Sequence, residues 1–162
     1  MMKKHMILLA VALLGFSALQ AQGAFDLEVK TLDGNVVTLS DELTGDLIVL
    51  DFWTTWCKPC IRSIPEIIGV SEKYDESKVQ FIGMNEDSPR NQNKVKPMVN
   101  SLKIPYTVLV DNEQGVLSEL MVTAFPTLLI MNRKGEVLYT HVGFSSGDEV
   151  ELENKINELL AL

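Results

Sequence analysis

Two cysteines, Cys57 and Cys60, are the residues of this chain whose type and spacing most directly indicate chemistry. They follow an apolar run and open a segment with helical periodicity, which places both in the first turn of a helix. Residues three apart share a helix face, so the two sulfurs can reach bonding distance. The free N–H groups and the helix dipole stabilise a thiolate at Cys57, and Lys58 adds positive charge. This pattern predicts thiol–disulfide exchange, with Cys57 as nucleophile and Cys60 as the shielded resolving thiol.

Other uses of a two-cysteine motif fit the sequence less well. A disulfide between residues three apart closes too small a loop to stabilise the fold much. A zinc site needs two further Cys or His ligands, and residues 24–162 offer only His141. A pair of inert buried thiols is the remaining alternative, but Trp56, Lys58 and Pro59 indicate an exposed turn. We therefore expect no metal, and we expect His141 to be an ordinary solvated or hydrogen-bonded strand residue.

The segments around the pair alternate between strand and helix patterns, which predicts an α/β fold with a mixed sheet. A hairpin is expected over residues 25–39, around Asp33-Gly34. Further strands are expected at residues 47–53, 79–84, 106–110, 127–131 and 136–142. Helices are expected from Cys57 to about residue 74 and at residues 89–102, 115–121 and 146–160. Ser146 and Glu149 have the spacing of a capping box at the start of the last helix.

The chain is acidic, with a formal charge of −8. Its first 23 residues hold two lysines and no acidic residue, so the remainder carries 12 basic and 22 acidic side chains. A domain this acidic is repelled by phosphate backbones, which argues against nucleic acid as a partner. The charged stretches at residues 94–96 and 148–153 are most simply explained as solvated helix faces.

The N-terminus has the pattern of a secretion signal. Lys3-Lys4 precedes an apolar run over residues 6–14, and small residues follow before Asp26. This pattern predicts a signal peptide at residues 1–21, cleaved at about residues 21–23, and a single exported domain at residues 24–162. The periplasm is the expected location. The alternative is an uncleaved membrane anchor, for which the apolar run is short.

The stretch from Asp51 to Cys60, DFWTTWCKPC, closely resembles the active-site segment of the thioredoxins. Pro65 falls where that family has a kinking proline in its first long helix, and Phe125-Pro126-Thr127 resembles its cis-proline segment. The turn at residues 132–135 matches as well. The N-terminal hairpin and an insertion at about residues 86–110 are similar to those of the exported TlpA/ResA-type proteins. The resemblance implies a thioredoxin fold with a helix–strand insertion.

The same resemblance implies a function outside the cytoplasm. TlpA/ResA-type proteins reduce disulfides there, often in cytochrome c maturation or stress resistance. The redox group would be the Cys57–Cys60 disulfide itself, with no other cofactor. The implied partners are disulfide-containing exported proteins and a membrane electron donor of the DsbD or CcdA type, and we expect a monomer.

The resemblance also assigns a role to Asp51, which lies in the middle of an apolar run six residues before Cys57. It matches the buried acid of the thioredoxins, whose pKa is raised by burial and which takes the proton of the resolving thiol. Many TlpA/ResA proteins have Asn at this position. Relatives of ResA often carry an acid where this chain has Ser63, so the function of that acid is not carried over to this chain.

Five residues around the cysteines are expected to meet the substrate. Trp56, next to Cys57, is a candidate docking surface, and Lys58-Pro59 lies between the cysteines and affects the redox potential. A cis Pro126 after Phe125 would offer strand-like hydrogen bonds to an extended substrate. The predicted substrate-binding residues are therefore Trp56, Lys58, Pro59, Phe125 and Pro126.

Three alternatives remain open on the sequence. The pair could act as a disulfide oxidant or isomerase, because the direction of electron flow depends on its redox potential. A peroxiredoxin shares the fold, and Thr54-Thr55 weakly resembles its threonine-rich loop, but the CxxC motif fits electron exchange better. A copper metallochaperone of this fold usually spaces its cysteines by three residues and adds a histidine ligand, which this chain does not match.

Overall fold

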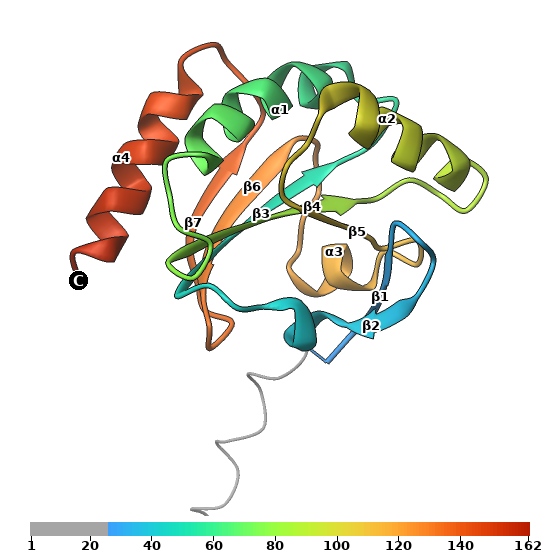
Figure 1. Ribbon diagram of the computed structural model, residues 1–162, viewed down its shortest axis with the longest axis horizontal. Helices are drawn as coiled ribbons and strands as arrows, with labels where there is room; N and C mark the ends of the chain where they lie inside the picture. Colours follow the sequence, from blue (N-terminus) through green and yellow to red (C-terminus); the bar gives the residue numbers. More distant parts are fainter. Residues whose placement is uncertain (1–25) are drawn as a thin grey trace, which may run out of the picture.

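The computed structural model describes residues 26–162, which form a seven-stranded mixed sheet between two layers of helices (Figure 1). The strand order is β2-β1-β5-β4-β3-β6-β7. The strands are β1 Glu28–Thr31, β2 Val36–Thr38, β3 Leu47–Trp53, β4 Val79–Asn85, β5 Thr107–Val110, β6 Thr127–Asn132 and β7 Val137–Val142. Strands β3, β4 and β5 run parallel, whereas β6 and β7 add antiparallel pairs on one side. The expected α/β architecture with a mixed sheet is confirmed.

Helices cover both faces of this sheet. They are α1 Lys58–Ser71, α2 Val95–Leu102, α3 Gly115–Glu119 and α4 Asp148–Leu160, with 3₁₀ turns η1 Leu39–Glu42 and η2 Gln92–Lys94. Helices α1, α2 and α4 lie on one face, and α3 and η1 lie on the other (Figure 1). Helix α1 starts where β3 ends, so the central strand and the longest helix meet at the cysteine pair.

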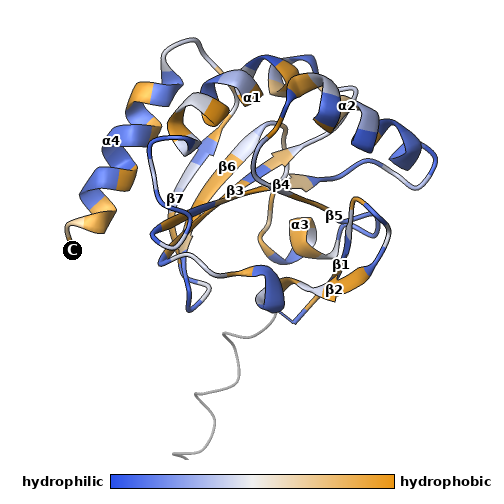
Figure 2. Ribbon diagram, viewed as in Figure 1, coloured by the Kyte–Doolittle hydropathy of each residue, from blue (hydrophilic) through white to orange (hydrophobic). Residues whose placement is uncertain are grey.

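The central strands are apolar because both of their faces are covered. All seven residues of β3 and of β4 are buried, and the two strands appear as hydrophobic ribbons in the middle of the molecule (Figure 2). Leu50 and Phe52 pack toward α3, whereas Val49 packs toward α1 and α4. Asp51 shares the second face with Val49, because side chains alternate along a strand. The acid therefore lies under α1.

The N-terminal hairpin and the insertion form the other half of the sheet. Strands β1 and β2 pair antiparallel around a turn in which Gly34 has a φ of 85°. The insertion consists of η2, α2 and β5, as the resemblance implied. Strand β5 pairs with β4 on one side and β1 on the other. The insertion thus joins the hairpin to the core of the sheet.

Two local predictions were wrong. The helix expected over residues 89–102 begins only at Val95, after turns at residues 88–94, because Val95 and Val99 are the first positions buried against the core. The capping box of Ser146 and Glu149 does not form. Instead Gly147 enters α4 with a φ of 100°, and the Asp148 carboxylate accepts a hydrogen bond from the backbone N–H of Ser145 at 2.6 Å.

The predicted signal peptide at residues 1–21 and the alternative membrane anchor lie outside the described residues. Within residues 26–162, none of the helices combines the length and the apolar character needed to cross a bilayer.

Candidate active site

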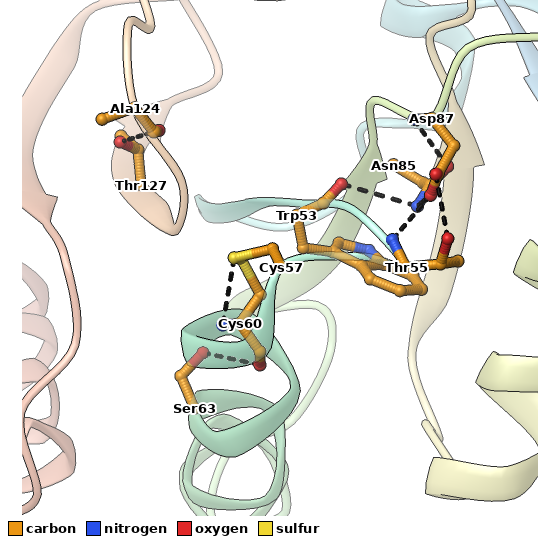
Figure 3. The surroundings of a disulfide bond; sticks show 9 residues. All are labelled: Trp53, Thr55, Cys57, Cys60, Ser63, Asn85, Asp87, Ala124 and Thr127. Atoms are coloured by element: carbon orange, nitrogen blue, oxygen red, sulfur yellow. Dashed lines mark hydrogen bonds between the residues drawn. A yellow bond between two sulfur atoms is a disulfide. The ribbon is translucent and has the colours of Figure 1, made fainter. Parts of the chain in front are cut away.

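The two cysteines form a disulfide at the N-terminus of α1 (Figure 3). Cys57 is the N-cap residue, and its sulfur accepts a hydrogen bond from the backbone N–H of Cys60 at 3.2 Å. The side chain of Cys57 is 5% exposed, whereas that of Cys60 is fully buried. The outer sulfur is therefore the one within reach of a substrate, and the helix end that would stabilise its thiolate is in contact with it.

The loop that precedes Cys57 is fixed by an acid on the neighbouring strand. Asp87, just after β4, accepts hydrogen bonds from the Thr55 backbone N–H at 2.7 Å and the Thr55 hydroxyl at 2.9 Å. Asn85 Nδ2 also donates to this carboxylate at 3.0 Å (Figure 3). This support is not predicted by the sequence. Its only signal was a polar Asn-Glu-Asp run where a buried strand ends beside the active-site loop.

A second loop approaches the cysteines from the start of β6. The Phe125–Pro126 peptide bond is cis, as the resemblance implied, and Thr127 Oγ1 donates to the Ala124 carbonyl at 2.8 Å. Figure 3 shows this loop facing the disulfide. Phe125 packs on the hydrophobic cluster that contains both cysteines. Its ring packs edge to face against that of Trp56, with the ring centroids 6.1 Å apart. The structure thus brings two distant parts of the predicted substrate face together.

The remaining predicted substrate residues lie on the rim of the site. Trp56 is 63% exposed, Lys58 is exposed and Pro59 is half-buried. Trp53, by contrast, is fully buried in the core. An exposed indole beside an accessible sulfur is suited to contact with an apolar partner segment.

Asp51 is buried in the middle of β3, at 2% exposure. Among residues 26–162, neither of its carboxyl oxygens finds a hydrogen-bond partner, and burial raises the pKa of Asp51 to about 7. The carboxyl lines a cavity of about 40 Å³ together with Ser63 and Pro126. Ser63, which replaces the acid of some ResA relatives, instead donates its hydroxyl hydrogen to the Cys60 carbonyl at 2.9 Å.

Three further acids near the site were not predicted. Glu66 on α1 and Glu149 on α4 line the same cavity as Asp51, so for Glu149 the expectation of a solvated face over residues 148–153 is wrong. Glu86, after β4, is buried, and desolvation followed by the Asp111 carboxylate raises the pKa of Glu86 to about 9. Charges on amphipathic helices give no sequence signal of burial, so only the packing of α1 against α4 shows the first two.

His141 is a hydrogen-bonded strand residue, as expected. It lies half-buried on β7, and its Nε2 lies 2.9 Å from the Asp148 carboxylate. Over residues 26–162, no three His, Cys, Asp or Glu side chains converge in a way that could hold a metal ion.

The fold and the disulfide at the start of α1 define a thioredoxin-fold protein with a dithiol–disulfide site. The chain belongs to the Redoxin family, which it matches over residues 19–156.

Individual relatives agree with this assignment. The chain is 29% identical to the thioredoxin-like protein YneN of Bacillus subtilis over 133 residues, covering 82% of this chain and 76% of YneN. It is 30% identical to the thiol-disulfide oxidoreductase ResA of Bacillus thuringiensis over 123 residues, covering 76% of this chain and 69% of ResA. A crystal structure from Chlorobium tepidum, provisionally assigned as a thiol:disulfide interchange protein DsbE, superimposes with a TM-score of 0.74 at 31% identity. That match covers 89% of this chain and 99% of the Chlorobium chain.

Proposed function

We propose that this protein is a thiol–disulfide oxidoreductase that reduces disulfides in exported proteins. The observation that carries the proposal is the Cys57–Cys60 disulfide at the N-terminus of α1, in which Cys57 is 5% exposed and Cys60 is fully buried. The redox group is this pair itself, with no bound cofactor. The names of its relatives, including a thiol-disulfide oxidoreductase ResA, support the same reaction.

The reduced protein acts in two steps, each of which forms one disulfide bond and breaks another. The Cys57 thiolate attacks one sulfur of a substrate disulfide, which forms a mixed disulfide and releases the first substrate thiolate. Cys60 then gives its proton to the Asp51 carboxylate and attacks the Cys57 sulfur. The second substrate thiolate leaves, so the substrate has gained two electrons and the protein has formed its disulfide.

Asp51 is suited to the proton transfer because its pKa of about 7 is close to working pH. A carboxylate of ordinary pKa would be a weaker base for a buried thiol. The buried position of Cys60 keeps that thiol from reacting with outside disulfides before the mixed disulfide has formed.

The substrate is proposed to dock on the surface around Cys57. The paired rings of Trp56 and Phe125 provide its apolar part, and Pro126 continues the same loop. Lys58 and Pro59 border the sulfur on the helix side. An unfolded or extended segment that carries a disulfide could contact both the apolar rings and the backbone around Pro126.

We also propose export to the periplasm, supported by the Lys3-Lys4 and apolar pattern at the N-terminus. A reductase in an oxidising compartment must be re-reduced after each turnover, so we propose a membrane dithiol donor of the DsbD or CcdA type. The protein would act as a monomer, cut from its signal peptide at about residues 21–23.

The proposed reaction is tested by insulin-disulfide reduction with dithiothreitol as the electron source. Cys57→Ser is expected to abolish catalysis and to form no mixed disulfide. The matched variant Cys60→Ser should also fail to turn over, yet it should trap one substrate molecule per protein through Cys57. Catalysis that survives in Cys57→Ser would overturn the assignment of the nucleophile.

The direction of electron flow is tested by the redox potential of the pair, measured against glutathione. A potential near the ~−270 mV of thioredoxin supports a reductase. A potential near ~−120 mV, as in DsbA, would instead identify an oxidant.

A further inference from the structure

The cavity beside Asp51, here named the Asp51 cavity, extends from the centre of the sheet toward its β7 edge. In the strand register Asp51 lies opposite Leu128 of β6, and Leu128 lies opposite His141 of β7. All three residues line the cavity, and residues of α1 and α4 line it as well. Its volume of about 40 Å³ is enough for about two water molecules.

Most polar side chains that line the Asp51 cavity are already satisfied by other groups. The Ser63 hydroxyl donates to the Cys60 carbonyl, and His141 pairs with Asp148. The Tyr139 hydroxyl donates to Glu151 Oε1 at 2.6 Å. The Ser63 and Tyr139 hydroxyls therefore already donate their hydrogens elsewhere, and the His141 Nε2 is engaged with Asp148.

The exceptions among the cavity-lining side chains are three carboxyl groups. Both oxygens of Asp51, Oε2 of Glu66 and Oε2 of Glu149 are buried without a hydrogen-bond partner in the part of the chain that the structure describes. Asp51 is 98% buried, since its exposure is 2%, and it lines one end of the cavity. Buried polar atoms without partners require a physical explanation, which bound water or a shared proton supplies.

The Glu66 and Glu149 carboxyl groups face each other across α1 and α4. Desolvation and the neighbouring Glu149 carboxyl raise the pKa of Glu66, and Asp148 on α4 adds to this effect. Two neighbouring carboxyl groups attract each other only when one of them carries a proton, because two carboxylates repel. Both residues are half-buried, so the pair can exchange protons with solvent as well.

We propose that the Glu66–Glu149 carboxyl pair carries the Asp51 proton to solvent through the Asp51 cavity. This inference depends on the proposed function. When Cys60 is oxidised, its proton moves to the Asp51 carboxylate, then through water in the cavity to the carboxylate of the pair. The pair, now holding one extra proton, releases it to solvent. Glu66 and Glu149 thus act through Asp51 and do not touch the sulfurs.

The other surroundings of Asp51 offer no comparable route. The neighbouring strand places Gly83 opposite Asp51, with the Trp53 indole against it. Trp53 Nε1–H is a donor only and cannot accept a proton. Burial and the Asp51 carboxyl hold the pKa of Tyr106 well above its usual range, so its hydroxyl does not titrate near neutral pH. The proton leaves toward α4, because the other described cavity-lining carboxyl groups with an unpartnered buried oxygen, Glu66 and Glu149, lie on that side.

The test follows proton release and thiol oxidation in the same reaction. Reduced protein is mixed at about pH 8, in weak buffer with a pH indicator, with 5,5′-dithiobis(2-nitrobenzoate), whose aromatic thiolates stay unprotonated after release. The second thiolate reports the attack by Cys60, and the indicator reports the one proton that leaves. The two signals are expected to coincide in the wild type.

Glu149→Gln should separate the two signals. The glutamine amide donates to the Glu66 carboxylate and stabilises its charged form, so that carboxylate accepts the Asp51 proton less readily. The second thiolate should appear at the wild-type rate, with proton release slower by on the order of tenfold. Glu66→Gln should behave in the same way and provides a second variant if Glu149→Gln is poorly folded.

The matched control is Glu153→Gln, which makes the same charge change on α4 at a residue that pairs with Lys73 outside the cavity. It should keep the two signals together. Proton release that stays synchronous in both Glu66→Gln and Glu149→Gln would overturn the relay. A wild-type protein that releases no second thiolate would instead overturn the proposed disulfide exchange.

Discussion

The fold buries two kinds of acid, which differ in the hydrogen bonds that their carboxyl oxygens accept. Asp87 and Asp111, after β4 and β5, accept hydrogen bonds from backbone N–H groups: Asp87 from Thr55, and Asp111 from three residues at the start of α3. Asp51, under α1, accepts no hydrogen bond from any residue that the structure describes. The three acids are buried to a similar extent, so they differ mainly in the hydrogen-bond donors around their oxygens.

The comparison shows how the fold separates structural acids from proton-exchanging ones. A buried carboxylate that accepts several N–H bonds fixes the backbone that donates to it. A buried carboxyl without donors keeps its proton to higher pH. Glu86, which also has no donor, goes further: its pKa of about 9 keeps it neutral near pH 7. Asp51, with a pKa of about 7, lies between these cases and can take and release a proton near neutral pH.

The largest expected effect is on stability, in Asp51→Asn. In wild type the pKa of Asp51 is raised from 3.8 to about 7, so the unfolded chain ionises first as the pH rises and the folded state loses stability between these values. The penalty reaches roughly 4 kcal/mol above pH 7. Asp51→Asn removes it, so the variant should be more stable than wild type at about pH 8 and similar to it near pH 4.

Urea unfolding of the oxidised protein at the two pH values measures this difference. The control is Asp46→Asn, because the hydrogen bond and charge of Lys78 lower the pKa of Asp46 at the surface. Its effect should be much smaller and of opposite sign. A stability gain in Asp51→Asn that is equal at both pH values would contradict the titration of Asp51.

Asp87→Ala is expected to have the next largest effect and to act in the opposite direction. It removes the acceptor for both donors of Thr55 and for Asn85, so it should cost about 2–3 kcal/mol of unfolding free energy. Thr55→Val is a control that removes only the hydroxyl bond and should cost about 1 kcal/mol. If Asp87→Ala unfolded at the same urea concentration as wild type, Asp87 would not support the active-site loop.

A smaller loss is expected in Asp111→Asn. The carboxamide keeps one acceptor oxygen for the N–H groups of Val116 and Leu117 but loses the charge that favours a helix N-terminus. The cost should be about 1 kcal/mol in the same unfolding measurement. A larger loss than that of Asp87→Ala would reverse the ranking and assign the main structural role to α3.

The sequence predicts the fold well wherever one element alone decides the pattern. The apolar run of β3 and the alternation around Asp33-Gly34 predict a buried strand and a hairpin, and both are present. The errors lie at helix starts. Ser146 and Glu149 have capping-box spacing, but the Asp148 carboxylate is bound to Ser145 and His141, and the chain turns at Gly147 instead. Contacts between elements override the local signal there.

The site residues also differ in how far the sequence alone predicts them. Cys57, Cys60 and Asp51 could be predicted as site residues because each lies in a distinctive local context, at a strand end or inside an apolar run. Glu66 and Glu149 could not, because a charge on an amphipathic helix usually faces solvent and nothing local shows that two helices bring them together. The support of Thr55 by Asp87 likewise depends on the parallel pairing of β3 and β4.

The central claim is that the outer cysteine is an activated nucleophile and the inner one is shielded. Alkylation of the reduced protein with iodoacetamide across pH, with the label located by mass spectrometry, tests this most directly. The account predicts that Cys57 alone is labelled, with a midpoint below the ~8.5 of a free cysteine. Equal labelling of Cys57 and Cys60, or a Cys57 midpoint at or above that value, would contradict it.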